Sequence, residues 1–292
     1  MESYAQVEII ETEKLTKRYD GISAIENLNL KVHAGETFGF LGPNGAGKTT
    51  TIRILTTLTK PSSGSASVSG FDVVKEPDKV KKMIGVVQQH LSLDRDLTVI
   101  ENMEFRARLR HLNSSERKKR INELLNYVEL TEHADRIVDE LSGGLKKRAS
   151  IVSSLMHQPE VLFLDEPTVG LDAQTRRRLW DLIRRLNLDG TTIFLTTHYI
   201  EEAEALCHRV GIIHKGHIIA LGKPLELRQK LGLMTVETLV NNKETRYHYF
   251  TDRDEAKRFV QKLPPEVKTI IIRESNLEDV FVEETGERVE GD

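Results

Sequence analysis

The stretch ETFGFLGPNGAGKTTTIRILTTL, residues 36 to 58, decides the fold of this chain. A short apolar run, residues 38–41, leads into a glycine-rich turn, and a helical pattern follows the turn. The turn fits G-x-x-x-x-G-K-[ST], a pattern in which backbone N–H groups surround phosphate oxygens and the next helix directs its positive end at them. A bare match can also mark a flexible surface loop, but the preceding strand and following helix favour a phosphate-binding loop.

Each residue type in this loop has a task in nucleotide binding. The glycines permit unusual backbone angles and let the backbone approach the phosphates. We expect Lys48 to reach the β- and γ-phosphates and the Thr49 hydroxyl to bind Mg²⁺, so a nucleotide and Mg²⁺ are the predicted ligands of the loop. The predicted nucleotide-binding residues here are Gly42, Pro43, Asn44, Gly45, Ala46, Gly47, Lys48, Thr49 and Thr50.

Composition limits the other functions that this chain can have. A length of 292 residues allows one large domain and a small one, and the single cysteine, Cys207, excludes an internal disulfide. The net charge of -3 lacks the basic excess of a nucleic-acid-binding protein, so no nucleic-acid partner is predicted. No apolar run approaches the roughly 18 residues that span a bilayer, and the N-terminus is acidic where a signal peptide is basic. We therefore expect a soluble chain that reaches a membrane only through a partner.

Strands and helices alternate along the chain in a way that predicts an α/β fold. Residues 7–41 show strand patterns, and residues 97–156 show helical patterns throughout, with helices opening at Thr98, Ser114 and Ser142. The later alternation predicts a doubly wound, mostly parallel sheet. The expected architecture is a P-loop NTPase core with an N-terminal antiparallel β region, an inserted helical subdomain and a small C-terminal α+β appendage.

A turn-forming segment at Gly222-Lys223-Pro224 predicts the boundary between two domains. We expect a nucleotide-binding domain over residues 1–222, with a helical subdomain inserted at about 92–156, and an accessory domain over residues 223–292. The accessory domain contains no catalytic cluster, so we expect it to serve packing or to brace a dimer.

Polar residues stand at the ends of several predicted strands. Gln88-Gln89 follows strand 84–87, Asp165-Glu166 follows a uniformly apolar strand, and His198 follows TTIFLTT. Taken singly, these residues read as surface carboxylates or a hydrogen-bonded core histidine. In α/β sheets, however, the carboxyl ends of strands bind ligands, and these residues converge there with the phosphate loop. The set therefore predicts a catalytic nucleotide site.

Two further features point toward nucleotide binding. Leu141-Ser142-Gly143-Gly144 opens a helix with exposed N–H groups, a second anion-binding end that the local nucleotide does not need. Tyr19 lies near the phosphate loop in a strand-turn context. It reads equally well as a packed strand tyrosine and as a platform for a base to stack on.

In this order, the motifs resemble those of the ATP-binding cassette (ABC) ATPases. GPNGAGKTT is similar to the Walker A motif, VLFLDEP to Walker B and LSGG to the signature motif, while Gln89, Gly170-Leu171-Asp172 and His198 match the Q-loop, D-loop and switch histidine. Tyr19 stands where the family places its adenine-stacking aromatic residue. The resemblance covers residues 5 to about 222, and the tail SNLEDVFVEETG resembles the daunorubicin-resistance branch of drug exporters.

This resemblance implies an ATPase that powers a membrane transporter, specifically an exporter, from the cytoplasmic face of the cell membrane. It implies a separate polytopic permease and a head-to-tail dimer, either a homodimer or a pair with a second cassette. Lys48 would hold the phosphates of ATP, and Thr49, Gln89 and Asp165 would hold Mg²⁺. Glu166 would activate or position the water, Gln89 would also lie near that water, and His198 would contact the γ-phosphate. Lys48, Gln89, Glu166 and His198 are thus the predicted catalytic residues. Residues of the opposed cassette would complete each site: Ser142, Gly143, Gly144 and Asp172.

Another class of function stays open from the sequence. A soluble cassette protein can act as a nucleotide-dependent switch on ribosomes or DNA, but such proteins typically fuse two cassettes or insert long coiled coils. This chain has neither feature. A neighbouring gene for a polytopic permease would favour transport. Nothing in these residues specifies the cargo, which could be a drug, lipid, polysaccharide or ion.

Overall fold

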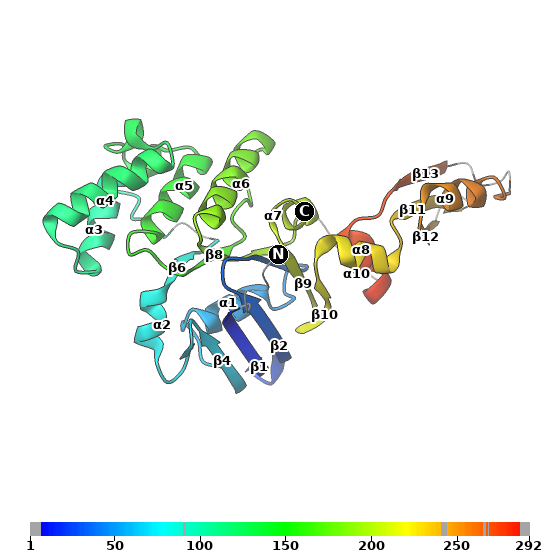
Figure 1. Cartoon of the computed structure of the whole chain (residues 1–292), viewed down its shortest axis with the longest axis horizontal. Coiled ribbons are helices and arrows are strands. Elements are labelled where there is room, and N and C mark those ends of the chain that lie inside the picture. Colours follow the sequence, from blue (N-terminus) through cyan, green and yellow to red (C-terminus); the bar gives the residue numbers. More distant parts are fainter. Residues whose placement is uncertain (1–6, 90–91, 241–243, 265–266, 268, 287–292) are drawn as a thin grey trace.

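The computed structural model describes residues 7–89, 92–240, 244–264, 267 and 269–286. Within these residues the strands form a four-stranded, a six-stranded and a three-stranded sheet. The first two sheets and most helices make a compact body, and the third sheet belongs to an arm that extends away from it (Figure 1). This arrangement confirms the predicted fold class.

The N-terminal sheet is antiparallel and has the strand order β2-β1-β4-β5. Its hairpin turns at Asp20 and Gly21, both of which have positive φ, as a tight two-residue hairpin turn requires. The strands are β1 (Glu8–Tyr19), β2 (Ile22–His33), β4 (Ser63–Val68) and β5 (Phe71–Asp72).

The central sheet has the order β10-β9-β3-β8-β7-β6, and only β10 runs antiparallel to its neighbour. Every residue of β3, β7 and β8 is buried, as expected for parallel strands covered on both faces. Parallel pairing brings their carboxyl ends to one edge. The strands are β3 (Thr37–Leu41), β6 (Ile84–Val87), β7 (Val161–Asp165), β8 (Thr192–Thr197), β9 (Arg209–His214) and β10 (His217–Gly222).

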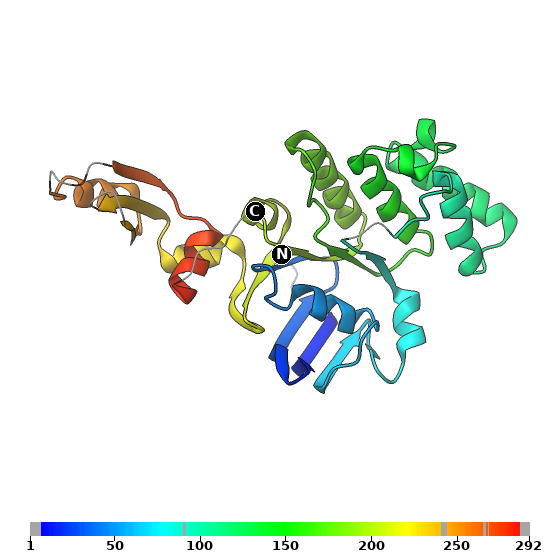
Figure 2. The same cartoon turned by 180° about the vertical axis from the view of Figure 1, so that it is seen from behind.

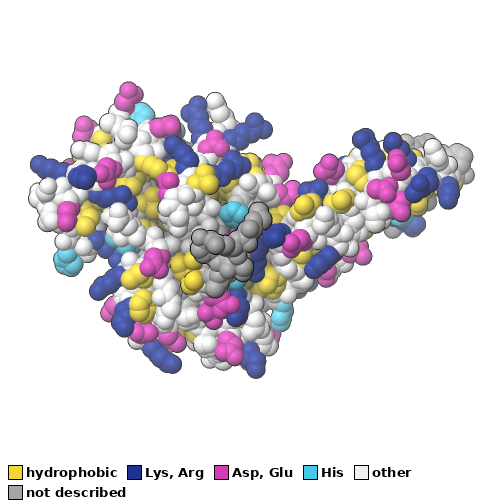
Figure 3. Space-filling model, viewed as in Figure 1, with side chains coloured by type: hydrophobic (Ala, Val, Ile, Leu, Met, Phe, Trp, Pro, Cys, Tyr) yellow, Lys and Arg dark blue, Asp and Glu magenta, His cyan; other side chains and the backbone are white. Residues whose placement is uncertain are grey.

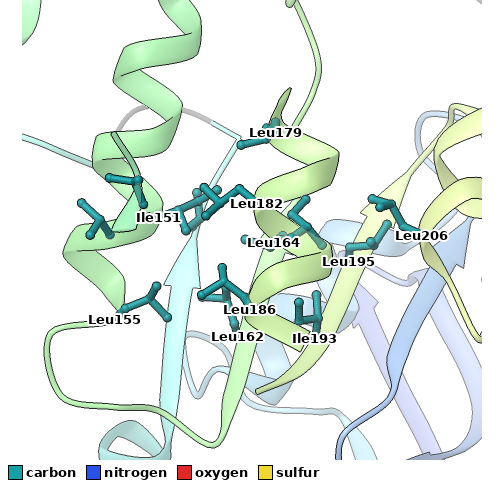
Figure 4. Packing of buried hydrophobic residues seen from close by; sticks show 14 of the residues in the cluster. Ile151, Leu155, Leu162, Leu164, Leu179, Leu182, Leu186, Ile193, Leu195 and Leu206 are labelled. Carbon is teal, nitrogen blue, oxygen red and sulfur yellow. The ribbon is translucent and has the colours of Figure 1, made fainter. Parts of the chain in front are cut away.

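Alternate side chains of this sheet pack into two separate cores. Leu162 and Leu164 of β7 face the α5 and α6 side, where leucines and isoleucines interdigitate (Figure 4). Phe163 points to the opposite face and packs against Phe194 of β8, with ring centroids 5.5 Å apart. The helices around the sheet are α1 (Lys48–Leu55), α2 (Pro77–Met83), α6 (Ala173–Leu188) and α7 (Ile200–Leu206).

Cys207, just after α7, fills a space that a glycine leaves open. A Cβ on Gly39 of β3 would lie 2.5 Å from the Cys207 Sγ, so the strand must carry glycine there. The thiol is buried, and burial raises the pKa of Cys207 well above its usual value.

Three α-helices lie within residues 97–156, but residues 128–142 form turns and two short 3₁₀ helices, so the prediction of helix throughout this range is confirmed only in part. Thr98 caps α3 in a full capping box with Glu101, and Ser142 caps α5. Helix α4 begins at Ser114, as predicted, and the preceding residue, Asn113, caps it, because its side-chain oxygen accepts from the Glu116 N–H at 2.9 Å. The elements are α3 (Val99–Leu109), α4 (Ser114–Tyr127), the 3₁₀ turns Thr131–His133 and Val138–Glu140, and α5 (Gly143–Ser154).

The C-terminal arm joins the body through two of its helices, α8 and α10 (Figure 2). The Leu277 N–H of α10 donates to Glu204 Oε1 of α7 at 3.1 Å. Arg273 donates through both terminal nitrogens to Asp279, at 2.6 and 2.7 Å. The elements are α8 (Pro224–Leu231), β11 (Met234–Val240), β12 (Glu244–Phe250), α9 (Arg253–Val260), β13 (Thr269–Glu274) and α10 (Leu277–Thr285).

The surface mixes positive and negative charge. On the face in Figure 3, Lys and Arg side chains are interspersed with Asp and Glu. This distribution differs from the continuous basic patch of a nucleic-acid-binding surface. None of the helices in the described part of the chain combines the length and the apolar character needed to cross a membrane.

Candidate nucleotide-binding and catalytic site

The phosphate loop connects β3 to α1, and two of its glycines are required by close neighbours. A Cβ on Gly42 would lie 2.3 Å from the Ile213 carbonyl oxygen, and one on Gly47 would lie 2.6 Å from the Ala24 carbonyl oxygen. Gly45 has open space around it but a φ of +78°, which side chains rarely adopt. The loop leads into the start of α1. The first N–H groups of a helix have no intrahelical partner, so they are available to bind phosphate oxygens.

Lys48 begins α1 and turns its side chain back over the loop. Its ammonium group donates to the carbonyl oxygens of Gly42 at 2.7 Å and Pro43 at 3.1 Å. It also lies 3.0 Å from Glu166 Oε1. Both side chains are almost fully buried, so this ion pair is shielded from solvent.

Asp165, the last residue of β7, lies beside the loop. Its Oδ1 accepts from the Thr196 hydroxyl at 2.6 Å and from the Thr49 hydroxyl at 3.4 Å. Carboxylate and hydroxyl oxygens are the donors that Mg²⁺ prefers, and Mg²⁺ usually takes only one or two protein ligands beside substrate phosphates. The pair Thr49 and Asp165 therefore fits Mg²⁺.

Glu166 links the two halves of the site. Its backbone has the left-handed φ of +46°, and its N–H donates at 3.1 Å to both the carbonyl and the hydroxyl oxygen of Thr196. One carboxylate oxygen pairs with Lys48, and the other lies 3.0 Å from His198 Nδ1. The carboxylate thus bridges two residues predicted to contact the γ-phosphate.

His198 follows β8, and its ring lies against the tilted ring of Tyr199. The Tyr199 ring centroid lies 4.2 Å from that of His198, and the Arg176 guanidinium carbon lies 4.7 Å from the Tyr199 centroid. The structure therefore brings together five of the predicted site residues: Lys48, Thr49, Asp165, Glu166 and His198.

Gln89 is not part of this cluster. It lies exposed beyond β6, and its contact with the rest of the fold is through its backbone. The ammonium group of Lys147, on α5, approaches the carbonyl oxygens of Gln88 at 3.2 Å and Gln89 at 3.5 Å. The metal-binding role of Gln89 remains a prediction.

Tyr19 is exposed rather than packed in the core. It retains 43% of its accessible surface, and the Lys17 ammonium group lies 4.8 Å from its ring centroid. This exposure is more than a packed strand tyrosine would show, and the role of Tyr19 in nucleotide binding stays a prediction. An exposed ring next to a cation fits a base-stacking platform.

The signature segment forms the start of α5, away from α1. Ser142 Oγ accepts from the Leu145 N–H at 3.4 Å, and Asp172 likewise caps α6 by accepting from the Thr175 N–H at 2.9 Å. A Cβ on Gly144 would lie 2.2 Å from Thr175 Cγ2, so this glycine lets α5 and α6 meet. Helix α5 packs on β6, α3 and α6, whereas α1 packs on β2, β4 and β7.

Thr196 and Lys147 contact predicted site residues but were not predicted from the sequence. Thr196 is fully buried and bonds both Asp165 and the backbone of Glu166. Thr196 follows the apolar residues of TTIFLTT at the end of a buried strand, and a polar side chain at such a position needs a hydrogen-bond partner. Lys147 gave no signal, because its contacts depend on how α5 packs beside β6.

Fold and site together define a nucleotide-binding α/β protein. The ABC transporter family model matches residues 25–169. The daunorubicin/doxorubicin resistance ATP-binding protein DrrA of Streptomyces peucetius is 42% identical, covering 81% of this chain and 72% of that protein. The Nod factor export ATP-binding protein I of Cupriavidus pinatubonensis is 37% identical, covering 95% of this chain and 91% of that protein.

A solved structure supports the same assignment. It is a dimeric ATP-binding cassette in a post-hydrolysis state bound to ADP and Pi, with 30% identity, a TM-score of 0.67 and coverage of 73% of this chain and 98% of that one. The chain belongs to the ABC transporter family. It is the family's ATP-binding subunit, an ATPase, which confirms the family, fold and enzyme class predicted from the motifs.

Proposed function

We propose that this chain hydrolyses ATP with Mg²⁺ to drive export through a separate polytopic permease. It would work at the cytoplasmic face of the cell membrane. The observation that carries the site assignment is the buried chain of contacts from Lys48 through Glu166 to His198, beside the Thr49 and Asp165 oxygens. Export is supported by the relatives, which are named for drug resistance and Nod factor export.

The chain's own residues would act in a simple order. The loop N–H groups and Lys48 bind the phosphates, and Thr49 and Asp165 hold Mg²⁺, which neutralises phosphate charge. The γ-phosphate of bound ATP would compete with the Glu166 carboxylate for Lys48 and His198, because the phosphate carries more negative charge. Glu166 is then released to accept a hydrogen bond from the attacking water and to position it.

A second cassette would complete the site. The N–H groups at the start of α5 form an anion-binding helix end, but α5 packs on elements other than those that hold α1. Ser142, Gly143 and Gly144 would therefore face the γ-phosphate of an opposed subunit, with Asp172 nearby. Either a second copy of this chain or a paired cassette could supply that surface.

The secondary structure supports the proposed domain boundary. Strand β10 ends at Gly222 and α8 begins at Pro224. We place the nucleotide-binding domain at residues 1–222, the inserted helical subdomain at about 92–156 and the accessory domain at 223–292. The described residues cover most of each domain but leave out both ends of the chain and four short internal segments.

The inserted helices would be the docking site for the permease. Gln89 precedes them in the chain, and a Gln89 that responded to the nucleotide would pass its movement on to them. We expect crosslinks from a co-purified permease to concentrate between about Gln89 and Glu140. A crosslink map confined to the chain after Pro224 would contradict this assignment.

Tyr19→Ala should weaken ATP binding more than it slows turnover at saturating ATP. Stacking contributes to ground state and transition state alike, by roughly 1–3 kcal/mol in analogy to base stacking. Calorimetric titration with ATP tests this, with Ile22→Ala, 75% exposed on the same hairpin, as the control. Equal ATP affinity in Tyr19→Ala and wild type would exclude the platform role.

A further inference from the structure

Glu202 of α7 carries a fully buried carboxyl group that the proposed mechanism does not use. It lies four residues after His198 in the chain. Glutamate side chains are almost never fully buried unless they are paired, because burial disfavours the charged form. The neighbours of this carboxyl group must therefore account for its position.

The carboxyl group of Glu202 meets three other segments of the fold. The Trp180 indole N–H, on α6, donates to Glu202 Oε1 at 3.1 Å. The Thr168 hydroxyl, in the turn after Glu166, and the Thr197 hydroxyl, at the end of β8, lie beside the same carboxyl group. Both threonines are buried, so solvent does not satisfy these groups.

One oxygen of this carboxyl group and one neighbouring hydroxyl group lack partners. Glu202 Oε2 and Thr168 Oγ1 are both buried, and neither has a hydrogen-bond partner among the described residues. Buried polar groups are almost always hydrogen-bonded in folded proteins. Because the two side chains lie next to each other, a small movement of either one would join them. The two unpaired atoms therefore indicate that Glu202 and Thr168 are partners for each other.

The surroundings of Glu202 favour a neutral carboxyl group. Arg176 of α6 and Lys147 of α5 attract it, but neither forms an ion pair with it within the described part of the chain. Burial is the stronger influence and raises the pKa of Glu202, although the hydrogen-bonding neighbours and Arg176 oppose the rise. A neutral carboxyl group has an O–H that can donate to the Thr168 hydroxyl oxygen.

This contact would join the two segments that carry predicted catalytic residues. Thr168 lies two residues after Glu166, and its carbonyl oxygen accepts from the Leu171 N–H at 3.2 Å. Glu202 is on the helix that follows His198. The Glu166 Oε2 and His198 Nδ1 atoms face each other at 3.0 Å. A bond from Glu202 to Thr168 would therefore hold the Glu166 segment at a fixed distance from His198.

We propose that Glu202, in its neutral form, is a positioning residue for ATP hydrolysis. Its Oε1 accepts from the Trp180 indole N–H, and its Oε2–H donates to the Thr168 hydroxyl oxygen. The side chain thereby ties the segment after Glu166 to the helix after His198. The proposal rests on the proposed catalytic roles of Glu166 and His198, and it adds a residue that sets their geometry.

Steady-state ATP hydrolysis by the full-length chain tests this role through two substitutions of similar size. Glu202→Gln should keep kcat within about twofold of wild type, because an amide can also accept from Trp180 and donate to Thr168. Glu202→Leu should lower kcat by about 10- to 100-fold with KM for ATP unchanged, since reacting groups misplaced by about 1 Å lose up to about 10²-fold in rate. The same two changes at Glu201, which is exposed on the same helix, should leave kcat and KM unchanged.

Thr168→Val is an independent test, because it removes only the hydroxyl group. This variant should lower kcat as much as Glu202→Leu does. The double variant Thr168→Val/Glu202→Leu should lose no more than either single variant, because all three lack the same contact. Calorimetric titration should give wild-type ATP affinity for each variant, which excludes a folding defect.

Each contrary result has a distinct meaning. A Glu202→Gln variant as slow as Glu202→Leu would show that the negative charge is required, and it would overturn the neutral donor. Wild-type kcat in Glu202→Leu or in Thr168→Val would overturn the positioning role and leave the roles of Glu166 and His198 intact. Those roles would be lost separately, if Glu166→Gln hydrolysed ATP at the wild-type rate.

Discussion

Glu166→Gln is expected to lower ATP hydrolysis by about 10²-fold or more, within the range of general-base contributions. The change keeps the side chain's size but removes the negative charge that bridges Lys48 and His198. ATP binding should survive, because Lys48 still donates to the loop carbonyl groups and the loop amides still face the phosphates. Near-normal hydrolysis in this variant would remove Glu166 from the catalytic role.

Intact ATP should then hold two subunits of the Glu166→Gln variant together. Light scattering should show dimers with ATP and monomers with ADP. Adding Ser142→Arg should prevent the dimers, because it puts bulk and positive charge at the helix end that must approach the opposed γ-phosphate. Undisturbed dimers in the double variant would mean that α5 does not complete the site of the partner.

Gly42→Ala should weaken ATP binding and lower the rate of ATP hydrolysis by about 10²-fold, the scale expected when reacting groups are misplaced by about 1 Å. The new Cβ would lie 2.3 Å from the Ile213 carbonyl oxygen, which is backbone and cannot rotate away. Such overpacking should also cost about 1–3 kcal/mol of unfolding free energy. Calorimetric titration, an ATPase assay and thermal unfolding measure these effects.

Gly35→Ala is the matched control for that variant. Gly35 has a φ of +75° and open space around it, so alanine there adds only backbone strain of about 1–2 kcal/mol. It should lower stability and leave ATP affinity unchanged. Equal ATP affinities in Gly42→Ala and Gly35→Ala would show that the contact with Ile213 does not set the loop's position.

The sequence predicts the scaffold of the site well, because short-range rules govern it. The phosphate loop, the buried strand before Asp165 and the caps at Thr98 and Ser142 all follow from local residue patterns. The convergence of strand ends at one sheet edge follows from parallel pairing. Local rules also predict the start of α4 at Ser114, which the structure confirms.

Contacts between side chains from distant elements could not be predicted from the sequence. The bridge from Lys48 to His198 through Glu166 depends on a left-handed backbone at Glu166 and on bonds from Thr196. Neither is encoded in residue spacing. The hollow lined by Arg106 and Arg110 likewise depends on how α3 packs beside α5, which residue spacing does not specify.

The burial of Cys207 has a practical value for spectroscopy. The thiol is packed against Gly39, and its raised pKa keeps it protonated, so maleimides and other thiolate-selective probes should leave it unmodified in the folded protein. It is also the only cysteine of the chain. A single cysteine introduced at an exposed position would thus carry a fluorophore or spin label selectively, without first removing the native thiol.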